Sequence, residues 1–175
     1  MSKGFPRSLG RQNKAVAATV KDTIVLDGKT VTVTSVAAAI GFGSLQIHDF
    51  PEGNILVHGI AGTIGFAGSG ADANLADTWE GDFGIGTTPA ADATITGADV
   101  DIVASTASGA ATAEVIAPAR IASALAAALM LDNTDGSLEL NLNVLIDAAD
   151  IVDDESVVLT LSGTLQIAYV VLGDD

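Results

Sequence analysis

Two histidines, His48 and His58, are the only imidazoles in the chain, and Asp49 and Glu52 lie close to them in sequence. Two histidines and a carboxylate can form a facial metal site. The spacing of these residues matches no compact metal motif, and histidines on neighbouring strands more often lie at a sheet end or an interface. We therefore expect no metal centre.

Carboxylates gather near the C-terminus, where they could in principle surround a calcium ion, which prefers several oxygen ligands on a flexible loop. The acids of this run are Asp147, Asp150, Asp153, Asp154 and Glu155. The run lacks the glycine of a calcium-binding loop, and in Asp132–Ser137 Gly136 comes one place too early for one. We expect a solvated acidic loop rather than a calcium site.

Motifs for catalysis are missing. The glycines of the segment 80–86 match neither a dinucleotide fingerprint nor a phosphate loop, and Asp82 would repel phosphate, so we interpret the segment as a turn. Gly41–Leu45 and Gly68–Gly70 both miss the serine nucleophile elbow. The chain has no cysteine, which excludes thiol chemistry.

Carbohydrate cleavage is disfavoured as well, because a glycan cleft normally presents aromatic platforms and the chain has one Trp and one Tyr. No nucleophile, base and orienting group can be assembled from these motifs. We therefore expect a protein that is not an enzyme and needs no cofactor.

The elements that would position any site are mainly strands. Asp27-Gly28 separates two β-branched runs, Thr23–Leu26 and Lys29–Thr34, and this dipeptide is typical of a type I′ turn in a hairpin. Val31 and Val33 alternate with threonines, so one face of the second run should be buried. The dense glycines of residues 40–70 argue for short strands with bulges rather than helices.

Further strands are expected along the rest of the chain. Thr94–Thr96 and Val100–Val103 are short candidates, the latter with Asp101 facing solvent. Asp132–Gly136 should form a turn, followed by a half-buried strand in which Leu138, Leu140, Leu142 and Val144 alternate with polar residues. Val157–Val171 should form a long, bent final strand with a shift of register near Gly163.

Pro118–Leu131 leaves two alternatives open. Ile121, Leu125 and Leu129 recur every four residues among alanines, and Pro118 suits a helix start. The same residues also fit the period of two that is typical of a strand. The predicted fold class is all-β, an antiparallel β-sandwich that resembles a jelly roll, with at most one short helix.

The charges divide the chain into a basic arm and an acidic body. Residues 1–21 carry +5 without an acid, whereas residues 22–175 hold all 22 acids against two cations, a net charge of −20. We expect an extended arm over residues 1–15, a single domain over residues 16–175, and no secretory signal, because only Ala15–Val20 separates Lys14 from Lys21. The acidic body would repel an anionic membrane surface and the phosphate backbone of a nucleic acid, so neither is an expected partner of the body.

The arm is the candidate binding site for a protein partner, since such segments often become ordered on binding. The basic residues proposed for this contact lie within residues 1–21 and are Lys3, Arg7, Arg11, Lys14 and Lys21.

Three segments carry a resemblance to a family. Asp27–Thr30, Phe50–Asn54 and Leu131–Val144, followed by the acidic loop and the final strand, look like segments of small, jelly-roll-like virion proteins of tailed bacteriophages. The resemblance touches about half of the chain and rests on turn and strand motifs. It implies a capsid decoration or cement protein, a non-enzymatic subunit, often a homotrimer, on the outer capsid surface, where it clamps neighbouring copies of the major capsid protein.

The leading hypothesis is therefore a virion protein that decorates and stabilises a bacteriophage capsid. The alternatives are a phage tail, fibre or other virion subunit, and a small β-sandwich module that binds a ligand. A membrane or a specific nucleic acid is not an expected partner.

Overall fold

The alternation of valine and threonine in residues 30–34 produces a strand that is buried on one side only. In the computed structural model, which describes residues 19–36, 40–70, 72–123, 125 and 127–172, this strand is β2 (Thr30–Thr34). Val31 and Val33 are buried and Thr30 and Thr32 are exposed, because successive side chains of a strand point to opposite faces. This part of the prediction is confirmed.

Ten strands form one antiparallel sheet in the described part of the chain. The strands are β1 (Val20–Val25), β2, β3 (Gly41–Asp49), β4 (Ile55–Ala67), β5 (Asp82–Gly86), β6 (Val103–Ala107), β7 (Val115–Ala122), β8 (Leu129–Leu131), β9 (Glu139–Ile146) and β10 (Ser156–Val171). A short 3₁₀ turn, η2 (Gly97–Asp99), interrupts the loop between β5 and β6. The predicted fold class, an all-β antiparallel fold resembling a jelly roll, is confirmed.

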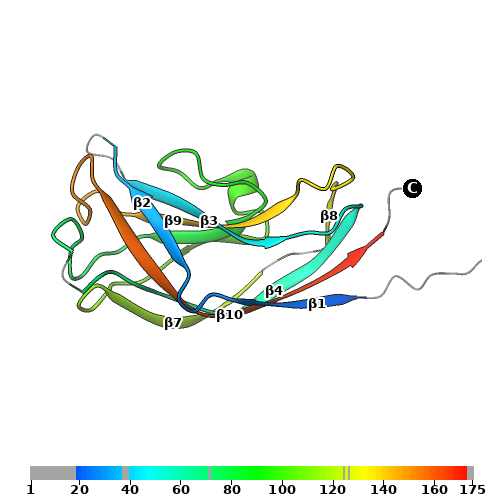
Figure 1. The fold of residues 1–175 in the computed structure, drawn as a ribbon, viewed down its shortest axis with the longest axis horizontal. Helices are drawn as coiled ribbons and strands as arrows, with labels where there is room; N and C mark the ends of the chain where they lie inside the picture. The colour runs from blue at the N-terminus through cyan, green and yellow to red at the C-terminus, as the bar shows by residue number, and fades with distance from the viewer. Residues whose placement is uncertain (1–18, 37–39, 71, 124, 126, 173–175) are drawn as a thin grey trace, which may run out of the picture.

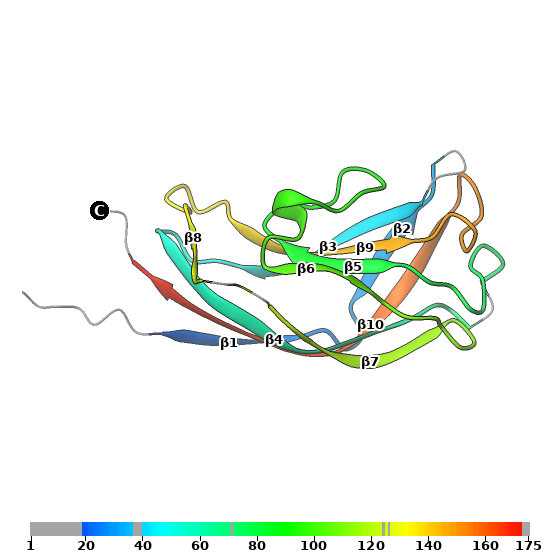
Figure 2. The same cartoon turned by 180° about the vertical axis from the view of Figure 1, so that it is seen from behind.

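The sheet curls over on itself, so that two layers face each other across the core (Figure 1). Its order is β6-β5-β9-β3-β2-β10-β4-β7, with β1 added to β10 and β8 added to β4. One layer contains β6, β5, β9 and β3, and the other contains β1, β10, β4 and β7 (Figure 2). Strand β2 and the first part of β10 connect the two layers at the curl.

The long strand β10 organises the second layer. One of its edges pairs with β2 through Ser156–Thr160 and then with β1 through Thr164–Tyr169, while the other edge pairs with β4. Its inward side chains stay in phase on both sides of Gly163, and the register irregularity lies between Ala168 and Tyr169. The long final strand is confirmed, and the predicted position of the register shift is wrong.

The core lies between the two layers and is mostly aliphatic. Aromatic rings add two clusters: Phe66 packs against Trp79 and Phe83 with ring centroids 6.2 and 5.5 Å apart, and Phe50 packs edge-on against Tyr169 at 5.3 Å. Burial of this many apolar side chains supplies the main driving force for folding.

The hairpin predicted at Asp27-Gly28 is wrong. Strands β1 and β2 do not pair with each other but follow one another along the same edge of β10. The dipeptide forms a local turn within this line, in which Gly28 has a φ of +78° and Lys29 N donates to Leu26 O (2.9 Å). The Asp27 carboxylate accepts a hydrogen bond from Gly163 N (2.6 Å), which fixes the turn against β10. A turn does form at this dipeptide, but the predicted type I′ is wrong, because Gly28 has a positive φ and Asp27 does not. The pairing of the flanking strands depends on β10, a strand far away in sequence.

The alternatives for residues 118–131 are decided in favour of strands, because β7 and β8 both pair with β4. Two other predictions are wrong: Gly81–Gly86 is not a turn but includes strand β5, and Thr94–Thr96 is not a strand. The glycines of β5 allow close approach of other backbones; a Cβ at Gly86 would overlap Ala98 O. Of the predicted strand Val100–Val103, only Val103 lies in a strand, where it begins β6.

Candidate partner-binding surface

Of the basic residues predicted to bind a partner, Lys21 lies within the described structure. Lys3, Arg7, Arg11 and Lys14 lie outside the described residues, as does the whole predicted arm, residues 1–15, so their role stays a prediction. Lys21 is exposed on β1 and points away from the core. The surface around Lys21 therefore defines the part of the candidate site that the structure describes.

This surface is the side of β1, β10, β4 and β7 that faces away from the core, which we call the outer face. Strand register brings its side chains into rows that cross neighbouring strands. The rows are Lys21–Ala168–Gly59, Thr23–Gln166–Ala61–Ala122 and Val25–Thr164–Thr63–Arg120. Most of these side chains are small, so another protein surface could approach the backbone of the sheet closely.

The outer face has an unusual charge for this protein. Strands β1, β4, β7 and β10 together contain one acidic residue, Asp22, although the chain contains 22 acids. Asp22 lies on the opposite side of β1 from Lys21, where Tyr169 Oη donates a hydrogen bond to its carboxylate (2.7 Å). Lys21 and Arg120 therefore project from a face without outward carboxylates, flanked by the exposed His58.

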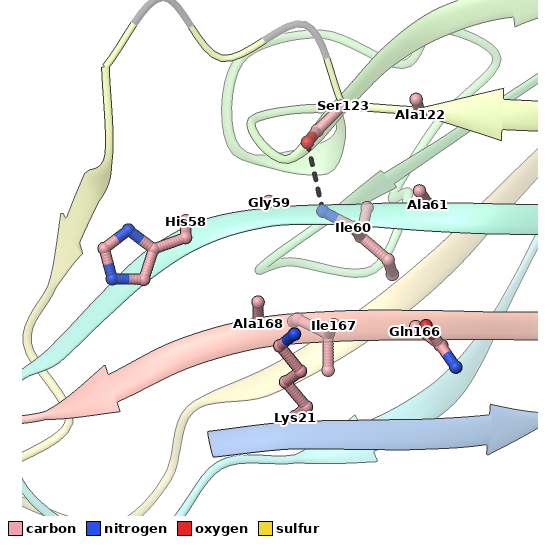
Figure 3. A pocket seen from close by; sticks show the side chains of 10 residues that line it. All are labelled: Lys21, His58, Gly59, Ile60, Ala61, Ala122, Ser123, Gln166, Ile167 and Ala168. Atoms are coloured by element: carbon pink, nitrogen blue, oxygen red, sulfur yellow. Dashed lines mark hydrogen bonds between the residues drawn. The ribbon is translucent and has the colours of Figure 1, made fainter. Parts of the chain in front are cut away.

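Figure 3 shows a hollow in this face between Lys21 and His58. Most of the residues that line it are small or polar, and they come from β1, β4, β10 and the end of β7. Ser123 Oγ accepts a hydrogen bond from Ile60 N (3.0 Å), and Ser123 N donates to Ile60 O (2.8 Å), so the chain after β7 is fixed against β4. A second hollow continues from Ala61 and Gln166 towards Arg120.

The opposite charge gathers at one end of the molecule, on loops that we call the acidic end. The loop before β5 and the loop before β10 pair there: Ala76 N donates to Asp150 O (2.8 Å), and Val152 N donates to Asn74 O (3.0 Å). Both loops lie away from the end of β10 in Figure 1. The acidic residues are Asp72, Asp77, Glu80, Asp82, Asp147, Asp150, Asp153, Asp154 and Glu155.

The acidic loop that the sequence predicted, with Asp147, Asp150, Asp153, Asp154 and Glu155, is the loop before β10. Asp150 accepts a hydrogen bond from Glu80 N (2.8 Å), which joins the two loops. Among the residues that the structure describes, no group of three or more His, Asp or Glu side chains is arranged to hold a metal ion.

The two histidines face different surroundings. His48 packs edge-on against Phe50, with ring centroids 5.0 Å apart, whereas His58 is exposed beside the outer face. Burial lowers the pKa of His48, and the carboxylates of Asp22 and Asp49 offset part of this shift. His48 Nε2 lies 3.7 Å from Asp22 Oδ2, too far for a hydrogen bond.

Buried polar side chains of structural importance were missed by sequence reasoning. The predicted strand is confirmed as β9, but Asn143 on it is fully buried, so the prediction that this strand is half-buried is wrong. The loop between β5 and β6 covers the second face of β9. Asp101, which was expected to face solvent, is instead half-buried in this loop, where its carboxylate accepts hydrogen bonds from Thr87 N and Oγ1. Burial raises the pKa of Asp101, and the bonds from Thr87 oppose this shift.

A second buried asparagine, Asn133, joins two of the segments on which the family resemblance rests. Its Nδ2 donates to Phe50 O (3.1 Å) and Pro51 O (2.8 Å), and its Oδ1 accepts from Leu138 N (2.7 Å). The segment 50–54 and the predicted turn at 132–136 thus form one hydrogen-bonded unit.

No family model and no curated protein matches this sequence. Among solved structures, that of the infectious bursal disease virus Gx strain is similar with a TM-score of 0.40 and 12% identity over 86% of this chain and 33% of that chain. A VP2 subviral particle of the same virus has a TM-score of 0.39 and 12% identity, over 86% of this chain and 32% of that chain. The chain spans about a third of the length of those chains.

In the described ranges, no helix is sufficiently long and apolar to cross a membrane.

Proposed function

We propose that this protein is a non-enzymatic virion subunit that decorates a bacteriophage capsid from the outside and stabilises it by clamping neighbouring major capsid subunits. The resemblance of three sequence segments to small phage virion proteins supports this proposal. The observation that carries it is the outer face: a broad, exposed sheet surface without outward carboxylates, on an otherwise acidic protein. Such a surface suits protein contact better than catalysis.

The basic N-terminal segment extends this contact in the proposal. It precedes β1 in sequence, and its four positive charges, at Lys3, Arg7, Arg11 and Lys14, would meet the capsid. Few aromatic residues are available as hot spots, and many weak contacts repeated over a capsid lattice would supply the affinity. A homotrimer is the assembly proposed for the free protein.

The test is co-sedimentation with purified capsids of a candidate host phage. Full-length protein should pellet with capsids, and a variant with Lys3, Arg7, Arg11 and Lys14 replaced by serine should bind at least about tenfold more weakly. Lys29→Ser is a control for the loss of a single positive charge outside the arm. Undiminished binding of the four-serine variant would remove the arm from the proposal, and absence of binding by the full-length protein would remove the decoration function.

A further inference from the structure

We propose that the outer face of one copy binds the acidic end of a second copy, so that the protein assembles head to tail. The inference rests on the homo-oligomeric part of the proposed function. Within the oligomer the outer face would contact a second copy, and the N-terminal segment would contact the capsid. It names the two surfaces that would meet, which the sequence alone did not indicate.

Charge complementarity is the first argument. The described part of the chain contains Lys21, Lys29 and Arg120 as its Lys and Arg residues, and two of these project from the outer face. The third, Lys29, lies with Asp27 in the turn at the margin of this face, where the negative charge of Asp27 offsets the positive charge of Lys29. The acidic end, by contrast, presents carboxylates on two adjoining loops. A contact between the two surfaces would bring opposite charges together.

Exposed apolar side chains on both surfaces give the second argument. Val25 is 54% exposed on the outer face, and Val115 on β7 and Val158 on β10 are 47% and 48% exposed on the same side of the sheet. At the acidic end Val152, which directly precedes Asp153, is 47% exposed. Each surface therefore offers apolar area to bury and charges to pair, the usual composition of a protein interface.

Alternative arrangements fit these surfaces less well. Two outer faces placed against each other would bring Lys21 and Arg120 of both copies into one interface without a carboxylate to neutralise them. Two acidic ends would repel each other more strongly. Contact between unlike surfaces is heterologous, and it generates a closed ring if the rotation between copies closes.

The first experiment measures the molar mass of the full-length protein by light scattering over a concentration series. We expect oligomers that dissociate as salt is added, because ionic screening weakens the charge pairs. Lys21→Glu/Arg120→Glu should weaken self-association at least about tenfold. The control Lys29→Glu, a charge reversal in the turn at the margin, should have a clearly smaller effect, and circular dichroism checks that all variants fold.

The second experiment separates head-to-tail from face-to-face contact. Asp77→Asn/Glu80→Gln/Asp153→Asn alters the acidic end and leaves the outer face intact. Alone, this variant and the Lys21/Arg120 variant should each remain mostly monomeric. Mixed, they should form a species of two chains, because the intact face of one can take the intact acidic end of the other.

Each outcome decides the inference. Assembly of the mixture supports it. Oligomers that are unchanged by both sets of substitutions would overturn the inference and leave the proposed homo-oligomer standing. A monomer at every concentration would overturn both the inference and the homo-oligomer, whereas loss of capsid binding alone would affect the decoration function only.

Discussion

The side chain of Asn143 joins three segments that are far apart in sequence. Its Nδ2 donates to Thr88 O (2.9 Å) and Asp99 O (2.7 Å), and its Oδ1 accepts hydrogen bonds from Ala90 N (2.8 Å) and Ser44 Oγ. A buried amide that uses all these bonds fixes the loop between β5 and β6 over β9, since each group would be costly to leave unpaired.

We expect Asn143→Ala to lower the free energy of unfolding by about 2–4 kcal/mol, because it strands buried carbonyl and N–H groups. Asn141 is the matched control. It lies two residues away, is 4% exposed, and its Nδ2 has no hydrogen-bond partner in the described structure. The free energy of unfolding, measured by urea titration, should fall clearly less in Asn141→Ala than in Asn143→Ala. Equal losses in the two variants would contradict the structural role assigned to the hydrogen bonds of Asn143.

His48 makes stability depend on pH. Because burial lowers its pKa in the folded protein, the unfolded chain takes up this proton first as the pH falls below about 6.5. Stability should therefore decline from that pH down to the folded pKa of His48 and change no further through this group. His48→Gln should make this decline shallower in urea titrations at about pH 7.5 and about pH 5.

His58→Gln is the control for the loss of an imidazole, because His58 is exposed beside the outer face. If the stability of His48→Gln falls with pH as steeply as that of the unsubstituted protein, other titratable groups dominate the loss of stability in acid.

At the level of elements, the closeness of β4 and β10 depends on Gly62. A Cβ at this position would overlap Thr164 O and would lie 2.8 Å from Leu165 Cα on β10. We expect Gly62→Ala to destabilise the protein by about 1–3 kcal/mol, because one of the two strands must shift. Ala61→Val, on the exposed side of the same strand, should change stability by less than about 0.5 kcal/mol. Thermal unfolding of the two variants tests the difference.

Local sequence patterns predicted those strands whose alternation of apolar and polar residues is the same whichever strand they pair with. Val31 and Val33 in β2, and the alternation along β10, indicate strands because one side of each faces the core. Asp27-Gly28 does form a turn, but its type and whether it reverses the chain depend on the pairing of both flanking strands with β10. Pairing over more than a hundred residues has no signature in a local window.

The same limit applies to β9 and to the outer face. Nothing near Asn143 in sequence indicates that the loop between β5 and β6 covers it. Lys21 was identified through the charge of its own segment, whereas Arg120 joins the same surface only because Val25, Thr164 and Thr63 align across four strands. Sequence reasoning therefore found one basic residue of the surface and missed the surface itself.

For the whole molecule, the gathering of carboxylates at the acidic end opposes folding through mutual repulsion. Moderate salt should raise the unfolding midpoint by screening this repulsion. Asp77→Asn/Asp153→Asn should raise the midpoint at low salt and reduce the response to salt. Glu52→Gln, a change outside the acidic end, should alter the dependence of the unfolding midpoint on salt less. The same dependence on salt in all variants would contradict this account.

The position of β10 has a consequence for the order in which this protein can fold during synthesis. Strands β1, β2 and β4 all pair with it, although it is the last strand to be made. Until about residue 171 leaves the ribosome, these earlier strands carry unpaired edges, which are prone to aggregation. Completion of the sheet must therefore wait for the end of β10. A chain that stopped at Gly163 would lack the strand that pairs with β1 and with most of one edge of β4.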